Sequence, residues 1–342
     1  MLRLFANAKY DFIAVRRYAY AVTALLIVPG LLWLMVHGLN YSIEFTGGTL
    51  VQVQSKRPVD VASLRTGLDR EGLHGAEIQN FGAPNEFVVR ARAAKPGSDP
   101  NDTQATAEAV RQALGAVLGA DNFTVVRIEA VGPKVGGELR QKAFLAIFLS
   151  FFAVLAYLAY RFEWRFGLAA VIATLHDIVA TIAFIGILRL EVSLTVVAAV
   201  LSMVGYSLND TIIIFDRVRE NLKKHKKENF QQILNRSINE TLPRSVLTHG
   251  TTLSSLTALA IFGGEVIRPF SLVMTFAIFT GTFSSIYIAA PVLLLIEKRW
   301  PGQDARGARA FVPREAPAPA APASPVPAPT GGSGGSRSKA AV

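Results

Sequence analysis

Two acidic residues lie inside long apolar stretches of this sequence, where a charge is costly. Asp210 and its neighbour Asn209 stand near the end of an apolar run that begins at Ser193, and Asp177 follows His176 in the run before it. An Asp at the centre of a membrane helix costs about 2.5–3.5 kcal/mol on insertion scales, so such residues seldom persist without a partner or a function. A carboxyl group that is ionised in one state and neutral in another could carry protons.

A basic residue is available to pair with Asp210. Arg244 opens a later apolar stretch directly after Pro243, a residue suited to the first turn of a helix. If the two stretches cross a membrane in succession, both residues lie near the cytoplasmic side. An opposite charge favours the ionised carboxylate and burial favours the neutral acid, so a conformational change could tip the balance. We therefore predict that Asp210 carries protons with Arg244 as its charge partner.

Hydroxyl side chains accompany these charges. Thr174, Asp177 and Thr181 recur at helical spacing and share one helix face. A second stripe consists of Arg244, Thr248, Thr251, Thr252 and Ser255. Hydroxyls in membrane helices often serve only as contacts between helices, and a structural role for Asp177 also stays open. The candidate proton pathway comprises Asp210, Arg244, Asn209, Thr248, Asp177 and His176.

The composition predicts a membrane protein. Of 342 residues, 51% are hydrophobic and only 18% are charged, which is too apolar for an ordinary soluble domain. A span needs roughly 20 mostly apolar residues. The six candidates are 18–37, 141–160, 166–188, 193–215, 245–263 and 269–296. No small-residue cleavage site follows the first candidate, so we do not interpret it as a signal peptide. The lack of cysteine excludes disulfides and thiolate metal sites.

The distribution of charge predicts the orientation. Lys and Arg gather in residues 1–17, in a segment between the fourth and fifth candidates, 216–244, and in the tail, 301–342. The positive-inside rule then places both termini and the 216–244 loop in the cytoplasm, which agrees with six spans. The formal charge of +10 thus reflects membrane orientation, and we expect neither nucleic-acid binding nor a cofactor. Because Pro, Ala, Gly and Ser dominate the tail, it is predicted to be disordered.

One segment, 40–136, has the composition of a soluble domain and is expected in the periplasm. Alternating residues predict four strands and helical spacing predicts two helices. The strands are 49–55, 76–82, 86–92 and 123–132, and the helices are 59–72 and 102–118. This β-α-β-β-α-β order is typical of a ferredoxin-like sandwich. The predicted fold is an α-helical polytopic membrane protein with six transmembrane helices. The small α+β domain lies between the first helix, 18–37, and a five-helix bundle, 141–300.

Five stretches together carry a family resemblance. They are YSIEFTGGT (41–49), VGPKVGGELRQKA (131–143), LHDIVA (175–180), GYSLNDTIIIFDRVREN (205–221) and NETLPRSVLTHGTT (239–252). In this order relative to six spans, they resemble the SecF branch of the SecD/SecF family, which belongs to the resistance-nodulation-division superfamily of proton-driven transporters. The resemblance covers residues 10–300.

The resemblance implies a protein-export subunit of the bacterial inner membrane, and not an enzyme. A SecD-like paralogue would supply a second set of spans, and the pair would use the proton-motive force to draw preproteins from the SecYEG translocon after the ATP-driven SecA step. YajC and YidC are further implied partners, and lipid surrounds the spans. By motif, Asp210 matches the family's proton-pathway aspartate and Arg244 the arginine beside it. Glu44 stands where many members have Asp.

The two connections between the external domain and the membrane are rich in glycine. The first carries Glu44, Phe45, Gly47 and Gly48, and the second carries Gly132, Gly136 and Gly137. Glycine tolerates unusual backbone angles, which predicts hinges here, with tight turns at the membrane surface as the alternative.

Three other functions would make different demands on this sequence. A superfamily transporter of lipids or drugs would need a large apolar cleft, which the small external domain does not supply alone. A scaffold that only stabilises the translocon would make the aspartates structural. The sequence contains no phosphate loop, metal-ligand cluster or nucleophile–base pair typical of an enzyme. Since neighbours on a helix point about 100° apart, His176 and Asp177 are not expected to form a catalytic dyad.

Overall fold

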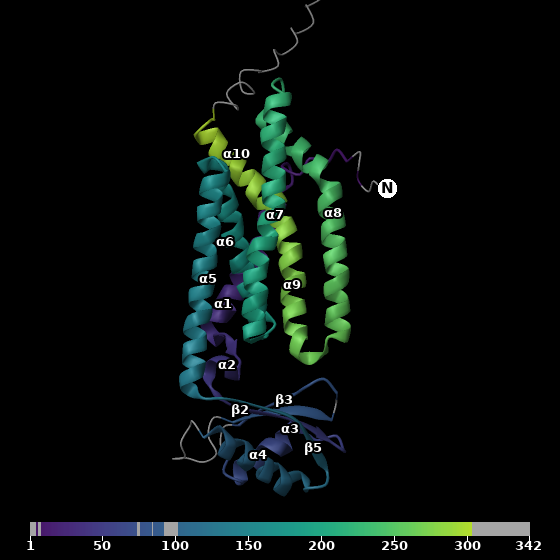
Figure 1. The fold of residues 1–342 in the computed structure, drawn as a ribbon. Coiled ribbons are helices and arrows are strands. Elements are labelled where there is room, and N and C mark those ends of the chain that lie inside the picture. The colour runs from purple at the N-terminus through teal and green to yellow at the C-terminus, as the bar shows by residue number, and fades with distance from the viewer. Residues whose placement is uncertain (1–4, 6–7, 74–75, 84, 92–101, 303–342) are drawn as a thin grey trace, which may run out of the picture.

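Long helices form a bundle, and a small α/β layer lies at one end of it in the computed structural model (Figure 1). The structure describes residues 5, 8–73, 76–83, 85–91 and 102–302, so nearly all of the predicted tail lies outside the described residues. The long helices are α1 (Arg16–His37), α5 (Pro133–Arg161), α6 (Trp164–Ile187), α7 (Leu194–Lys224), α8 (Phe230–Phe262) and α9 (Gly264–Ser284). A π-helical turn η1 (Ser285–Ala289) joins α9 to α10 (Ala290–Arg299).

Several of these helices are suited to a membrane. Within the described ranges, five helical segments are long and apolar enough to cross one: α1, α5, α6, α7 and the continuous stretch Gly264–Arg299. Only 11% of the most apolar window of α1 and 6% of that of α5 is buried, so both helices present apolar side chains outward. Such surfaces are stable in lipid rather than in water. The chain is therefore a helical polytopic membrane protein.

The helix α8 differs from the other long helices. It has 33 residues and packs beside α9, but it is not among the five apolar segments. Its polar residues explain this, because they recur along its length from Arg244 onward. Six spans, as predicted, are reached only if α8 also crosses the membrane.

The predicted basic loop 216–244 is mostly helical in the structure. Helix α7 continues to Lys224, and α8 begins after a capping box in which Asn229 and Gln232 each accept a hydrogen bond from the other's backbone amide. The segment is amphipathic, and its apolar side chains share one core cluster, Val218, Leu222, Ile233, Leu234 and Ile238. Burial of this face stabilises the helices, while their charges remain outside.

One consequence concerns Pro243. The sequence suggested that it opens a helix, but it lies inside α8, so that prediction was wrong. A proline within a helix removes one backbone hydrogen bond. The helix begins earlier because the capping box at its true start satisfies the free amides there.

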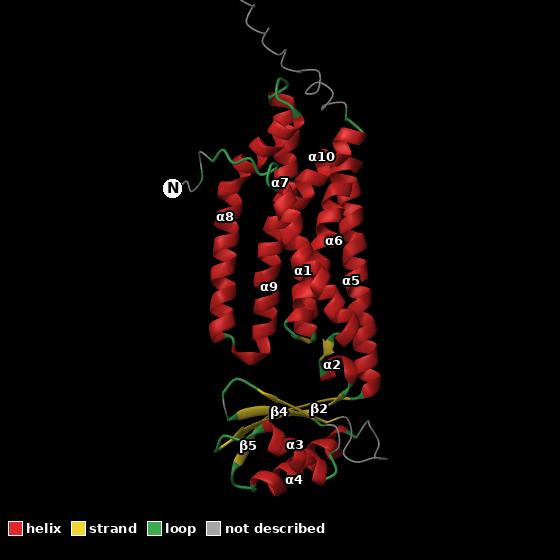
Figure 2. Ribbon diagram, turned by 180° about the vertical axis from the view of Figure 1, so that it is seen from behind, coloured by secondary structure: helices red, strands yellow, loops and turns green. Residues whose placement is uncertain are grey.

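The α/β layer has the predicted order of elements. They are β2 (Gly48–Ser55), α3 (Val61–Arg70), β3 (Glu77–Asn80), β4 (Glu86–Ala91), α4 (Thr103–Leu118) and β5 (Phe123–Val131). The sheet order is β3-β4-β2-β5, and every neighbouring pair is antiparallel. Both helices cover the face that points away from the bundle, as Figure 2 shows. Their core contains Val51, Val53, Leu64, Leu68, Val89, Val110 and Leu114. The β-α-β-β-α-β prediction is confirmed.

The domain boundaries differ from the predicted 40 and 136. Strand β1 (Asn40–Tyr41) pairs in parallel with β6 (Glu191–Val192), just before α7, and the one-turn helix α2 (Ile43–Thr46) packs against α5. These residues therefore belong to the end of the bundle. Sequence periodicity could not predict so short a strand, because its partner is far away in the chain.

The two glycine-rich connections touch each other. A Cβ on Gly47 would lie 2.7 Å from the Cα of Pro133, and a Cβ on Gly136 would lie 2.9 Å from the backbone nitrogen of Gly47. Gly47 also has a φ of +73° and Gly48 one of +125°, which favour glycine. This close approach favours the alternative interpretation, tight turns. Gly132 is the N-cap of α5, and a Cβ on Gly137 would meet open space.

Candidate functional site

The carboxylate of Asp210 is buried between α7 and α8. The side chain of Asp210 is 4% exposed, and its Oδ2 lies 3.3 Å from Nε2 of His249 on α8. The hydroxyl of Ser245 also forms a hydrogen bond with this carboxylate. Ser245 and His249 are four residues apart, so they share the face of α8 that packs on α7. Asp210 thus contacts the imidazole of His249 and the hydroxyl of Ser245.

The structure places Arg244, the predicted charge partner of Asp210, further away than His249. Arg244 is exposed and acts on Asp210 only through a longer-range electrostatic interaction. Its neighbour Ser245 faces α7 instead, because consecutive residues point about 100° apart on a helix. The group in contact, His249, was missed by the sequence analysis. The four-residue spacing of His249 from Ser245 would have pointed to His249 only if the face of α8 that packs on α7 had been known.

Two other predicted pathway residues point elsewhere. Asn209 is exposed, because its side chain points about 100° around α7 from the buried Asp210. Thr248 contributes its backbone carbonyl, which accepts hydrogen bonds from the hydroxyls of Thr251 and Thr252, both at 2.9 Å. Thr251 and Ser255 are exposed, so much of the polar stripe on α8 lies on the outer face of this chain.

The second carboxylate, Asp177, lies within the bundle and is fully buried. It accepts hydrogen bonds from Ser207 on α7 at 2.5 Å and from Ser284 at the end of α9 at 2.7 Å. His176 Nδ1 lies 2.9 Å from its other oxygen. The expectation that neighbouring side chains point apart was wrong here, since the imidazole bends back to the carboxylate. Thr174 and Thr181 are buried on the same helix face, as predicted.

Helix α7 connects the two carboxylates. It packs against α6, α8 and α9, and it carries both Ser207, which binds Asp177, and Asp210 one turn later. Gly281 on α9 lets the helices approach closely, because a Cβ there would lie 3.0 Å from the Cβ of Ser207. A movement of α7 would therefore change both sites. Among the residues that the structure describes, no cluster of three or more His, Asp or Glu side chains could hold a metal ion.

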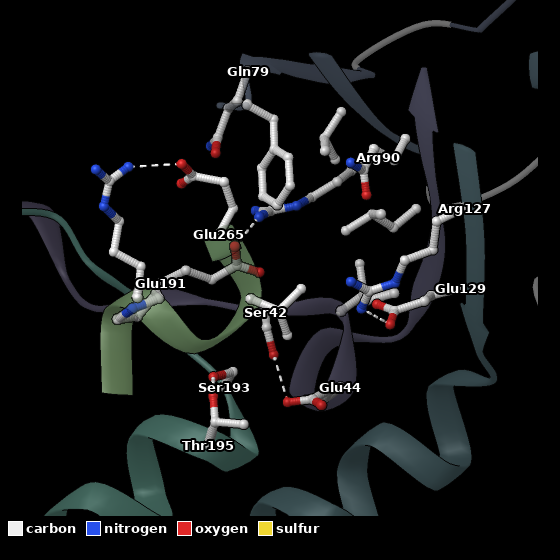
Figure 3. A pocket seen from close by; sticks show the side chains of 18 of the residues that line it. Ser42, Glu44, Gln79, Arg90, Arg127, Glu129, Glu191, Ser193, Thr195 and Glu265 are labelled. Atoms are coloured by element: carbon white, nitrogen blue, oxygen red, sulfur yellow. Dashed lines mark hydrogen bonds and ion pairs between the residues drawn. The ribbon is translucent and has the colours of Figure 1, made fainter. Parts of the chain in front are cut away.

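A second site lies where the sheet meets the bundle. Figure 3 shows this pocket of about 300 Å³, which lies between the end of the bundle and the sheet face that α3 and α4 do not cover. Its charged side chains are Glu44, Arg90, Arg127, Glu129, Glu191, Glu265 and Arg268. Arg90 on β4 forms an ion pair with Glu191 on β6 and lies 3.9 Å from Glu77. Burial raises the pKa of Glu191, although Arg90 acts in the opposite direction.

Glu44 connects the same pocket to α7. Its carboxylate accepts hydrogen bonds from the backbone amide of Leu194 at 2.6 Å and from the hydroxyl of Ser42 at 3.3 Å. Glu191 and Leu194 were not predicted as site residues, since nothing in their local sequence indicates these distant contacts. Together they join the external sheet and the glycine-rich connection to the start of α7.

The fold and these sites define a polytopic helical membrane protein with one α/β domain outside the bundle. Residues 111–299 match the family model described as "Protein export membrane protein SecD/SecF, C-terminal", and residues 32–59 match "SecD/SecF GG Motif". Proteins named protein translocase subunit SecF are similar. That of Gemmatimonas aurantiaca is 55% identical over 92% of this chain and 96% of its own length, and that of Desulfurispirillum indicum 42% over 84% and 92%.

A solved structure is also similar. The crystal structure of SecDF, a translocon-associated membrane protein from Thermus thermophilus, matches with a TM-score of 0.76 and 36% identity. The match covers 86% of the present chain but 40% of that chain. This chain belongs to the SecD/SecF family of protein export membrane proteins. Its role is therefore in protein transport, and its relatives are named as translocase subunits rather than as enzymes.

Proposed function

We propose that this chain is the SecF half of a SecD–SecF complex that uses the proton-motive force to assist preprotein movement through SecYEG after the SecA step. The observation that carries the proposal is the Asp210 carboxylate, buried in the bundle beside His249. Its direct partner is a titratable imidazole, and Arg244 acts only from a longer range. A carboxyl group in such a site can gain and lose a proton as the helices move.

The described residues contain only one half of a two-part transporter, which supports the need for a partner. It has one bundle and one external domain, whereas transporters of this kind are commonly built from two related halves. It aligns with only 40% of the SecDF chain. The exposed polar residues of α8, including Arg244, Thr251 and Ser255, would be poorly solvated in lipid. A SecD-like paralogue that covers them would satisfy these groups.

The proposed topology has six spans in the inner membrane, with α8 as the fifth and both termini in the cytoplasm. At 1.5 Å per residue, α8 is about 50 Å long, enough to cross a bilayer. Residues 8–15, the α7–α8 connection and the end of α10 lie at the end of the bundle opposite the α/β layer (Figure 1). The basic residues near these segments favour a cytoplasmic location, and the α/β layer is then periplasmic.

The test is preprotein export in membrane vesicles that contain the full chain with its SecD partner. Asp210→Asn keeps the shape of the side chain but cannot change its charge. We expect it to lose the part of export that the proton gradient stimulates while ATP-driven translocation continues. Full stimulation in this variant, at equal protein level, would favour the scaffold function instead.

A further inference from the structure

A small apolar pocket lies where α5, α6 and α7 meet, at the end of the bundle next to the α/β layer. Its volume is about 120 Å³. Apart from Arg140 and Tyr41, every side chain that lines it is a plain hydrocarbon. The wall includes Ala143 and Ile147 from α5, Ile182 and Ile185 from α6, and Val197 and Val200 from α7.

The pocket opens toward lipid. Phe144 lines it and is also 59% exposed, so the opening lies on the outward side of α5. Residues 143–160 of this helix contain no charged side chain, and only 6% of its most apolar window is buried. A helix surface of this kind is stable in the hydrocarbon core of a bilayer rather than in water.

The position of the pocket excludes the face assigned above to a second half. That face is on α8, where polar side chains are exposed. Figures 1 and 2 place α5 and α8 at opposite edges of the bundle. A partner that covers the polar residues of α8 therefore leaves the pocket beside α5 in contact with the bilayer.

The size of the pocket indicates what fills it. A water molecule takes up about 30 Å³ of liquid, and a methylene group is of similar size, so 120 Å³ admits about four methylenes. A helix, which is about 10 Å across with its side chains, cannot enter such a space. An acyl chain can, and it supplies the dispersion contacts that the apolar wall would otherwise lack.

Arg140 provides a polar group at one end of the pocket. It lies one turn before Ala143, toward the α/β layer, and about 32 Å along the axis of α5 from Arg161. This separation is close to the thickness of the hydrocarbon core, about 30 Å, so Arg140 lies at the level of the lipid headgroups. Arg140 is exposed, and within the described ranges its guanidinium forms no ion pair.

The chemistry of Arg140 suits a phosphate. The side chain of an arginine can lie along apolar surface while its head remains in the polar layer, and a guanidinium binds phosphate oxygens in a bidentate manner. The charged residues in the first turns of α5 are Lys134, Glu138, Arg140 and Lys142, which sum to a charge of +2. A headgroup with a net negative charge is therefore favoured over a zwitterionic one.

We propose that this pocket binds one acyl chain of an anionic phospholipid whose phosphate contacts Arg140. The bound chain would touch three helices and also Phe45, which lines the pocket from the glycine-rich connection. The site would thus join lipid to the junction between bundle and α/β domain. The inference goes beyond the proposed export function and requires only that α5 spans the membrane.

The test uses tryptophan fluorescence of the complete complex in vesicles of dibrominated phosphatidylglycerol or dibrominated phosphatidylcholine, because bromine quenches a tryptophan that it touches. Phe144→Trp places the reporter at the pocket. Leu145→Trp is the control, since Leu145 is 52% exposed at the same depth but does not line the pocket. The signal of the complex without the added tryptophan is subtracted. We expect phosphatidylglycerol to be preferred about fivefold at residue 144 and less than about twofold at residue 145.

Arg140→Gln, combined with Phe144→Trp, should reduce the preference at residue 144 to that at residue 145. Lys142→Gln should leave it largely intact, because Lys142 carries the same charge on the same turn but does not line the pocket. Equal preference at both reporters, or equal losses in the two glutamine variants, would overturn the site in favour of a general surface charge. Absence of quenching at residue 144 by either lipid would show that protein covers the pocket, which would also overturn it.

A second measurement tests the acyl chain. Phosphatidylglycerol added to the detergent-purified complex should raise its melting temperature, because a ligand of the folded state stabilises it. Ala143→Phe fills the pocket and should lose most of this shift, as should Arg140→Gln. Ala146→Phe should keep it, since Ala146 is exposed on α5 and does not line the pocket. A full shift in both Ala143→Phe and Arg140→Gln would show that the lipid binds elsewhere.

Discussion

The carboxylate of Glu44 accepts a 2.6 Å hydrogen bond from the backbone amide of Leu194, the first residue of α7. A negative charge at the start of a helix interacts favourably with the helix dipole. Asp210 lies on the same helix, about 24 Å further along its axis. The connection that leads into the α/β domain is thereby fixed to the helix that carries Asp210.

The first prediction concerns this cap. Glu44→Ala removes the acceptor for Leu194 and should lower the free energy of unfolding by about 0.5–2 kcal/mol. Thermal unfolding of the purified full chain in detergent measures the change. Glu138→Ala is the control, because Glu138 is an exposed acid on α5 at the same end of the bundle. Equal melting temperatures for the two variants would show that the Glu44 contact is not stabilising.

The second prediction concerns pH at the junction between sheet and bundle. Burial raises the pKa of Glu191, while Arg90 opposes this effect. A carboxyl group whose folded pKa is raised contributes stability that is present below the unfolded pKa and is lost as pH rises through the folded pKa. Acidification toward the unfolded value, about 4.3, should therefore stabilise the wild type relative to Glu191→Gln, which does not titrate.

Thermal unfolding of both proteins at pH 7 and pH 5 tests this expectation. The melting temperature of the wild type should rise relative to that of Glu191→Gln at the lower pH. A difference that stays constant with pH, or that changes in the opposite direction, would mean that Arg90 outweighs burial at this site.

The third prediction compares two neighbouring glycines. A Cβ on Gly136 would lie 2.9 Å from the backbone of Gly47, whereas one on Gly137 would meet nothing within 4 Å. Gly136→Ala should destabilise the protein by about 1–3 kcal/mol, because backbone must shift to make room. Gly137→Ala should be neutral or slightly stabilising, since alanine favours the helix. If both variants melt at the same temperature, the close contact between the two connections is not tight in solution.

The sequence predicted those features that depend on local pattern. The strands and helices of the α/β domain follow alternation and helical spacing, and Asp60 and Asp102 cap α3 and α4 through their side chains. The buried face of α6 follows from the spacing of Thr174, Asp177 and Thr181. These signals lie within one element, so no tertiary information is needed to read them.

The features that sequence analysis missed depend on how distant elements meet. Whether Arg244 or His249 contacts Asp210 is decided by the rotation of α8 about its axis. That rotation depends on how α8 packs on α7 and α9, which no local pattern in the sequence shows. The ion pair of Arg90 and Glu191 joins residues about a hundred positions apart, for which a single sequence carries no signal.

The last prediction distinguishes the two aspartates by their hydrogen bonds. Asp177 is fully buried and is surrounded by three groups that can donate to it, on Ser207, Ser284 and His176. Asparagine in its place loses the charge that strengthens these bonds and brings an amide donor among other donors. We therefore expect Asp177→Asn to lower the free energy of unfolding by about 1–3 kcal/mol.

Asp210 has a different environment, so the same substitution should act differently. An asparagine at residue 210 can donate to Nε2 of His249 or accept from it, because an amide carries both a donor and an acceptor. Asp210→Asn should then change the stability by less than about 1 kcal/mol while it abolishes gradient-stimulated export. Thermal unfolding and export, measured on both variants at equal protein level, provide the comparison. A large loss of stability in Asp210→Asn would show that the charge of Asp210, and not only its shape, stabilises the contact between α7 and α8.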